Sequence, residues 1–210
     1  MPLQNRVDPF GKLFASEARG TLFGNRGGKF HRDDRTLSAR RWTSRQWICC
    51  VLSFKGRARN VWGRYYTELF FLDEVTALAA GHRPCFECRR SDALAFAEAF
   101  GKSSHRPSAP EMDLVLHAER LEGRGKRVHR RALDDLPDGA MITLTGNEAL
   151  AVKGDALSPW TPFGYDSPRE RLRGVEVDVL TPPSILRALS RGFKPRWHET
   201  QAVPMLAGSA

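Results

Sequence analysis

Hydrophobic and polar positions along the chain predict short strands and short helices within one fold. Residues 175–180 alternate between apolar and charged side chains, which is typical of a strand with one buried face. Short apolar runs at 141–144 and 149–152 lie beside glycine-containing turns and predict two further strands. Residues 93–100 place apolar side chains on one helical face, and a pair of prolines favours a helix over 184–189. The expected class is therefore α+β.

A strand–helix–turn unit is predicted in the first half of the chain. The β-forming residues of 41–72 indicate a hairpin or meander whose second strand ends near Leu72. Asp73 is a suitable N-cap for the short alanine-rich helix that follows, and Gly81 suits the left-handed position at which a helix ends.

A further helix is predicted over residues 111–120. Asp113 and His117 are four positions apart and share one face of it. A carboxylate that orients an imidazole is the arrangement that a general base needs, although a solvent-facing helix also produces such pairs by chance. The pair is a candidate for catalysis, and the identity of any catalytic residue stays open.

The strand–helix–turn unit leads into Cys85-Phe86-Glu87-Cys88, directly after Pro84. Two thiolates at this spacing can bind one metal ion from a tight turn, and two more ligands must then come from elsewhere. A redox dithiol is disfavoured because no βαβ pattern surrounds the pair. A reduced pair without metal is the remaining alternative.

The run from Leu78 to Arg89, with Phe70-Phe71 and an acidic helix start upstream, resembles the metal-binding domain of Ada-type DNA alkylation-repair proteins. The likeness covers about Thr67 to Asp92. It implies a small zinc module that sits on DNA, in which four cysteines hold the metal and one of the upstream pair accepts a methyl group from a DNA phosphotriester. This chain carries an adjacent Cys49-Cys50 where the family has Cys-x-x-x-Cys, so the methyl-acceptor activity is not transferred.

Cys85 and Cys88 are therefore the expected zinc ligands. Neighbouring residues on a strand point to opposite faces, so only one of Cys49 and Cys50 is expected to join them as the third. A histidine is a candidate for the fourth ligand, and His82 is the nearest in sequence.

Around this module the chain is expected to divide into four parts. They are a basic irregular N-terminal arm with little core (1–40), an Ada-like zinc-knuckle module (41–100), a helical basic connector (101–135) and a β-rich C-terminal module (136–210). The predicted architecture is a small zinc-knuckle, treble-clef-like hairpin–helix module, followed by the helical connector and the β-rich module.

Positive charge is concentrated at one end of the chain. The first 60 residues hold 13 Lys and Arg against four Asp and Glu, which accounts for the whole formal net charge of +9. Most of these cations are arginines, whose planar guanidinium groups bind phosphate through two donors. A nucleic acid, DNA or RNA, is the expected partner, with DNA as the first choice, and a generally basic protein is the alternative.

Compartment follows from what the sequence lacks. It has no apolar run of ~18 residues that would span a membrane, and its N-terminus has no apolar signal segment. The cysteines do not form the pattern of a secreted disulfide scaffold. We therefore expect a cytoplasmic protein without a membrane partner.

Arginines and lysines around the module are the candidate nucleic-acid contacts. The glycine-rich stretch 20–32 suits phosphate contact or a plain surface loop, and the basic run 120–131 suits a second phosphate-binding surface. Trp47 is expected in the core, whereas Trp62, Tyr65 and Tyr66 are candidates for base stacking or for a small core. The predicted contacts are Arg26, Lys29, Arg40, Arg41, Arg45, Arg57, Arg59, Arg64, Arg83, Arg89 and Arg90.

Three functions are compatible with these patterns. The leading hypothesis is a zinc-containing DNA-binding protein linked to DNA repair or alkylation-damage surveillance. A metal-dependent nuclease on a zinc-knuckle scaffold is the second, and a non-catalytic binding module is the third. The histidines available to a nuclease are His31, His82, His117 and His129.

Overall fold

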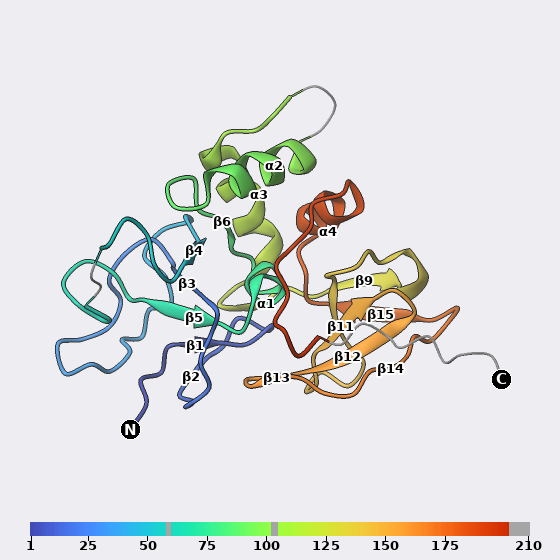
Figure 1. Ribbon diagram of the computed structural model, residues 1–210, viewed down its shortest axis with the longest axis horizontal. Helices are drawn as coiled ribbons and strands as arrows, with labels where there is room; N and C mark the ends of the chain where they lie inside the picture. Colours follow the sequence, from blue (N-terminus) through green and yellow to red (C-terminus); the bar gives the residue numbers. More distant parts are fainter. Residues whose placement is uncertain (58–59, 102–104, 202–210) are drawn as a thin grey trace.

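The computed structural model describes residues 1–57, 60–101 and 105–201, and it is an α+β fold (Figure 1). Two β-sheets lie on either side of a short helix, and three further helices pack together at one end (Figure 1). The predicted fold class is confirmed at this level. None of the helices in the described ranges combines the length and apolar character needed to cross a membrane.

The first sheet has the strand order β2-β1-β5-β3-β4-β6. Its strands are β1 (Arg6–Val7), β2 (Leu13–Phe14), β3 (Leu22–Asn25), β4 (Ile48–Val51), β5 (Leu69–Phe71) and β6 (Arg83–Pro84). The β3 strand pairs antiparallel with both β4 and β5, so these two strands do not form the expected hairpin. Gly24 makes this central position possible, because a Cβ there would lie 2.0 Å from the Ile48 carbonyl oxygen.

The N-terminal residues are also more ordered than an irregular arm. Val7, Leu22 and Phe30 are buried in one apolar cluster with Leu69 and Phe71 of β5. The sequence signal was weak because each of the strands concerned is two to four residues long. The correction matters for function, because the basic N-terminal segment is part of the sheet that positions the cysteines.

The second sheet has the strand order β13-β12-β11-β10-β15-β9, with β14 paired to β12. The predicted strands at 141–144, 149–152 and 175–180 correspond to β10, β11 and β15. The bounds are β9 (His129–Ala132), β10 (Met141–Thr143), β11 (Leu150–Lys153), β12 (Ala156–Thr161), β13 (Gly164–Tyr165), β14 (Arg169–Glu170) and β15 (Glu176–Val179). A single-turn 3-10 helix, η1 (Leu133–Asp135), follows β9. The segment 160–165 forms the end of β12, a tight turn and β13.

The α1 helix (Glu74–Ala79) lies between the two sheets (Figure 1), and all six of its residues are buried. Ala77 packs with the first sheet, whereas Val75 packs with Met141 and Leu180 of the second sheet region. Both predicted ends of this helix are confirmed. The Asp73 carboxylate accepts a 2.8 Å hydrogen bond from the Thr76 amide, and Gly81 has a φ of 83°.

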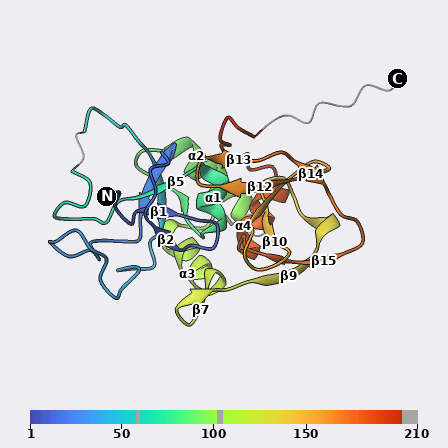
Figure 2. The same cartoon turned by 90° about the horizontal axis from the view of Figure 1, so that it is seen from below.

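The remaining helices form a group beside the sheets (Figures 1 and 2). They are α2 (Arg90–Phe100), α3 (Ala109–Arg120) and α4 (Pro183–Ser190). Phe96, Met112 and Ile185 meet in the buried core that these helices share. The α2 helix begins at Arg90, before the first residue of the predicted stretch 93–100.

A small hairpin follows α3 without a break. Its strands are β7 (Leu121–Glu122) and β8 (Gly125–Lys126). The hairpin carries Arg124 and Lys126 of the basic run 120–131, and it projects next to α3 in the view of Figure 2.

Candidate metal centre

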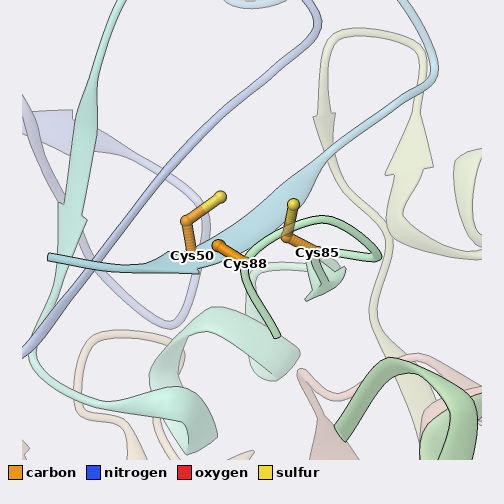
Figure 3. Close-up of side chains that lie close together, drawn as sticks. All are labelled: Cys50, Cys85 and Cys88. Carbon is orange, nitrogen blue, oxygen red and sulfur yellow. The ribbon is translucent and has the colours of Figure 1, made fainter. Parts of the chain in front are cut away.

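Two strands bring the cysteines together. The β4 strand runs parallel to β6, and the amide of Cys85 donates a 3.0 Å hydrogen bond to the carbonyl oxygen of Cys49. This register places Cys50 beside the turn that carries Cys85 and Cys88 (Figure 3). The three sulfur atoms all lie within 4.8 Å of one another. The sequence prediction of one ligand from the adjacent pair is therefore matched by Cys50.

Cys49 points away from this cluster. Its side chain is fully buried with Val7, Leu22 and Phe71 on the other face of the sheet. The Arg89 guanidinium donates to its sulfur at 3.6 Å. Burial raises the pKa of this thiol. Cys49 is thus a core residue, and it stands outside the group of converging sulfurs for the reason that the strand alternation gives.

His82 does not join the cluster either. Its ring is buried against Trp47 and Phe71, and its Nε2 accepts a 3.3 Å hydrogen bond from Arg26. Within the described ranges, no histidine or carboxylate extends the group of three sulfurs. Among the described residues, the candidate site therefore offers three cysteine sulfurs as ligands.

Protons are shared unequally among the three thiols. Hydrogen bonding from Cys50, and then from Cys88, holds the pKa of Cys85 well below its usual range. The same contacts with Cys85 raise the pKa of Cys50. The Glu87 amide also donates to the Cys85 sulfur at 3.4 Å. A thiolate accepting from two thiols is the arrangement in which a divalent cation can replace protons.

The geometry suits a tetrahedral metal ion. With Zn–S distances of ~2.3 Å, the sulfurs of a tetrahedral site lie roughly 3.8 Å apart. Separations within 4.8 Å thus need only small side-chain shifts. The cysteines are buried or half-buried in an apolar setting that includes Phe23 and Ile48. Residues and surroundings together fit a soft, thiolate-binding ion.

Two buried ion pairs hold the turn at its ends. Arg83, just before the turn, makes two 2.8 Å hydrogen bonds to the carboxylate of Asp113 in α3. Arg89, just after it, contacts Glu74 of α1 and Asp92 of α2, each at 2.8 Å. All of these groups except Asp92 are buried. The turn is therefore fixed to three helices independently of any metal.

Because of these ion pairs, two of the predicted phosphate contacts do not lie on the surface. Arg83 and Arg89 are buried and bound to carboxylates, so they serve the protein interior rather than its surface. Arg26 is also buried, beneath the Trp47 ring system. Arg59 lies outside the described residues. The other predicted contacts are exposed: Lys29, Arg40, Arg41, Arg45, Arg57, Arg64 and Arg90.

The proposed Asp113–His117 catalytic pair does not form. Asp113 is bound to Arg83, and the Nδ1 atom of His117 lies 3.1 Å from an Arg120 nitrogen. His31 is buried against Trp62 and bonded to a threonine, so it offers no free metal-binding face. Within the described ranges, neither the Asp113–His117 pair nor His31 therefore provides the metal-binding or catalytic group that the nuclease hypothesis needs.

Sequence reasoning missed a group of buried cations around Trp47. Trp47 itself is buried, as predicted, and the guanidinium carbons of Arg26 and Arg120 each lie 3.9 Å from its ring centroid. Arg26 follows β3 and Arg120 ends α3, so no local pattern connects them. Comparison with known proteins adds nothing to this picture, because no family model, curated protein or solved structure matches the chain.

Proposed function

We propose that this protein is a zinc-containing DNA-binding protein, in which Cys50, Cys85 and Cys88 hold a structural zinc ion. The observation that carries the proposal is the convergence of these three sulfurs from a strand and a turn that are far apart in sequence. Thiolate ligands favour soft or borderline ions, and zinc is the one that serves structural sites most often.

The candidate metal centre lies next to the start of a segment with exposed basic and aromatic side chains. This β4–β5 segment (residues 52–57 and 60–68) begins two residues after Cys50. Within it, Arg57 forms a 2.7 Å ion pair with Glu87, which stands between the two knuckle cysteines. An ion bound by the cysteines would fix both partners of this contact. The metal would therefore order the segment indirectly.

The β4–β5 segment has the side chains that contact nucleic acids. Tyr65 is 71% exposed and Tyr66 is 50% exposed, which is unusual for large aromatic residues. The guanidinium carbon of Arg64 lies 5.7 Å from the Tyr65 ring centroid. Exposed aromatic rings stack on bases, and neighbouring cations track the phosphates. Most of the excess charge also remains available, because among residues 1–57 only Lys29 and Arg57 form ion pairs and Arg26 is the one buried cation.

A link to alkylation damage rests on the sequence resemblance over residues 67–92. In that family a cysteine of the zinc site receives the methyl group. Of the clustered cysteines, Cys85 and Cys88 lie within the resembling stretch, but the methyl-acceptor activity is not carried over, because this chain has Cys49-Cys50 in place of the family's upstream pair. DNA binding is accordingly the primary proposal, and damage surveillance is its extension.

The test is the salt dependence of DNA binding, measured by fluorescence anisotropy with a labelled duplex. We expect the logarithm of the association constant to fall linearly with the logarithm of salt concentration. Arg57→Gln with Arg64→Gln should flatten the slope by about 2, because each phosphate contact contributes roughly one unit. Arg169→Gln with Arg173→Gln is the matched control, since these exposed arginines lie in the second sheet region.

Metal dependence is tested in the same assay. Protein stripped with a chelator should bind DNA less tightly than zinc-loaded protein. Without the metal, the cysteines no longer fix the start of the β4–β5 segment. A DNA affinity that does not change with salt concentration would contradict the proposal. So would an equal loss of affinity in the Arg169→Gln, Arg173→Gln control. Equal binding by stripped and zinc-loaded protein would remove the metal from it.

A further inference from the structure

A basic cavity of about 500 Å³ lies between the β1–β2 turn, the loop before β4, the end of α3 and the β7–β8 hairpin. In the view of Figure 2, α3 and β7 lie beside β2 at this place. Six of the fourteen lining residues are cations, and none is a carboxylate. The cations are Lys12, Arg26, Arg41, Arg120, Arg124 and Lys126.

The cavity floor holds positive charge without a paired carboxylate. Arg26 and Arg120 are 2% and 1% exposed, yet neither forms an ion pair with any described residue. The Arg26 guanidinium donates to the Gly11 carbonyl at 2.9 Å, and that of Arg120 donates to the Gly81 carbonyl at 2.9 Å. Carbonyl oxygens satisfy some of the N–H groups but leave the charge uncompensated.

One donor on the floor has no partner. The Nε atom of Arg120 is buried and makes no hydrogen bond within the described structure. An unpaired buried donor on a charged group costs stability, and an incoming acceptor would recover it. Asp8 and Asp113 are the carboxylates whose charges act on Arg26 and Arg120, but neither lines the cavity, and Asp113 is held by Arg83.

Electrostatics on the floor favour an anion. Burial, followed by repulsion from Arg26, lowers the pKa of Arg120 to about 9. Burial, followed by repulsion from Arg120 and Arg26, lowers the pKa of Lys126 to about 7. A bound anion would offset this repulsion between the cations.

The cavity also has an aromatic wall. Trp42 is half-buried at the rim and lies 5.9 Å from Trp47, centroid to centroid. Phe10 contributes a third ring to the lining. The volume falls within the range of small-molecule sites, and a mononucleotide combines the anionic and aromatic parts that these walls match.

We propose that this cavity binds the phosphate groups of a nucleotide on Arg26 and Arg120, with the base against Trp42. Lys12, Arg41 and Arg124 at the rim steer the phosphates inward and complete their coordination. The same nucleotide chemistry occurs in a free nucleotide and at a phosphorylated nucleic-acid end. The inference does not depend on the metal centre or on the β4–β5 segment.

Binding is tested with the full chain by quenching of tryptophan fluorescence, because Trp42 and Trp47 line the cavity. ADP should bind more tightly than pyrophosphate, and adenosine should not bind. Arg41→Gln and Arg124→Gln, both at exposed rim positions, should each weaken ADP binding roughly tenfold. Arg40→Gln and Arg127→Gln are matched controls, since these neighbouring exposed arginines do not line the cavity.

Separate arms distinguish the source of the nucleotide. A 5′-phosphorylated oligonucleotide that binds more tightly than its 5′-hydroxyl counterpart assigns the cavity to a nucleic-acid end, and equal binding assigns it to free nucleotides. Absence of ADP binding, or ADP binding that the rim variants leave unchanged, overturns the proposal. Equal affinity for pyrophosphate and ADP overturns the role of the aromatic wall. Loss of duplex binding in the Arg57 and Arg64 variants leaves ADP binding intact, so the two proposals fail separately.

Discussion

The buried ion pair between Arg83 and Asp113 makes the most direct prediction about what holds the cysteine turn. Both side chains are almost completely excluded from solvent, at 2% and 9% exposure, and two hydrogen bonds of 2.8 Å join them. Asp113→Asn keeps the volume but removes the charge, so the Arg83 guanidinium stays buried without a counter-ion. Breaking one partner of such a pair costs about 3–5 kcal/mol.

This loss is large compared with the total stability of a domain, which is about 5–15 kcal/mol. The assay is urea unfolding followed by circular dichroism, with the free energy taken at zero denaturant. Asp113→Leu alone should cause a similar loss, and adding Arg83→Met to it should recover much of that loss, because a packed apolar pair replaces two buried charges. The single changes and the double change together form a cycle that isolates the coupling.

The control is an exposed pair of the same chemistry. Lys29 and Asp33 form a 2.6 Å ion pair in which the aspartate is 96% exposed, so Asp33→Asn should leave the unfolding midpoint nearly unchanged. A cost below about 1 kcal/mol for Asp113→Asn, or strictly additive effects in the cycle, would refute the reasoning. The Arg83 pair would then contribute little to the position of the cysteine turn.

Two further predictions concern the metal centre and the buried histidine. Cys50→Ala should lower the bound zinc measured by elemental analysis, whereas Cys49→Ala should retain it, because only the Cys50 sulfur faces the turn; retention by both would exclude a three-thiolate site. His82 has a pKa well below its usual value through burial and then the charges of Arg26 and Arg120. Its stabilising effect is therefore complete above pH ~6.5 and falls by up to about 1.4 kcal/mol per pH unit below it, as the unfolded chain takes up the proton first. His82→Gln should flatten that slope in urea titrations between pH 5 and 7, and an unchanged slope would assign the acid sensitivity to other groups.

Local signals predicted local structure well. The Asp73 cap and the Gly81 stop mark α1 because a cap and a left-handed glycine act within one helical turn. The strict alternation of 175–180 predicted β15 because the side chains on one face of this strand are buried, whereas those on the other face are more exposed. The choice between Cys49 and Cys50 also follows from alternation, once the register of β4 on β6 is known.

Long-range pairings were out of reach of these signals. The β3 strand inserts between β4 and β5, and its four residues include a glycine and an asparagine that weaken any strand pattern. The Arg83–Asp113 pair joins residues 30 positions apart. The order of charged residues along the chain does not show which cations will be buried. The net charge therefore shows that the protein is basic, but it does not show which arginines reach the surface.

The β4 strand connects the two proposed sites. The backbone of Trp47, which precedes β4, accepts a 3.1 Å hydrogen bond from the Arg83 amide, and Cys49 accepts one from Cys85. Trp47 lines the basic cavity, whereas Cys50 faces the cysteine turn. Since β6 is hydrogen-bonded to β4 at both points, we expect a displacement of the turn to move the residues around Trp47 as well. The Arg83–Asp113 pair anchors the middle of this connection, so its loss should affect both sites, whereas loss of a rim arginine should affect only one.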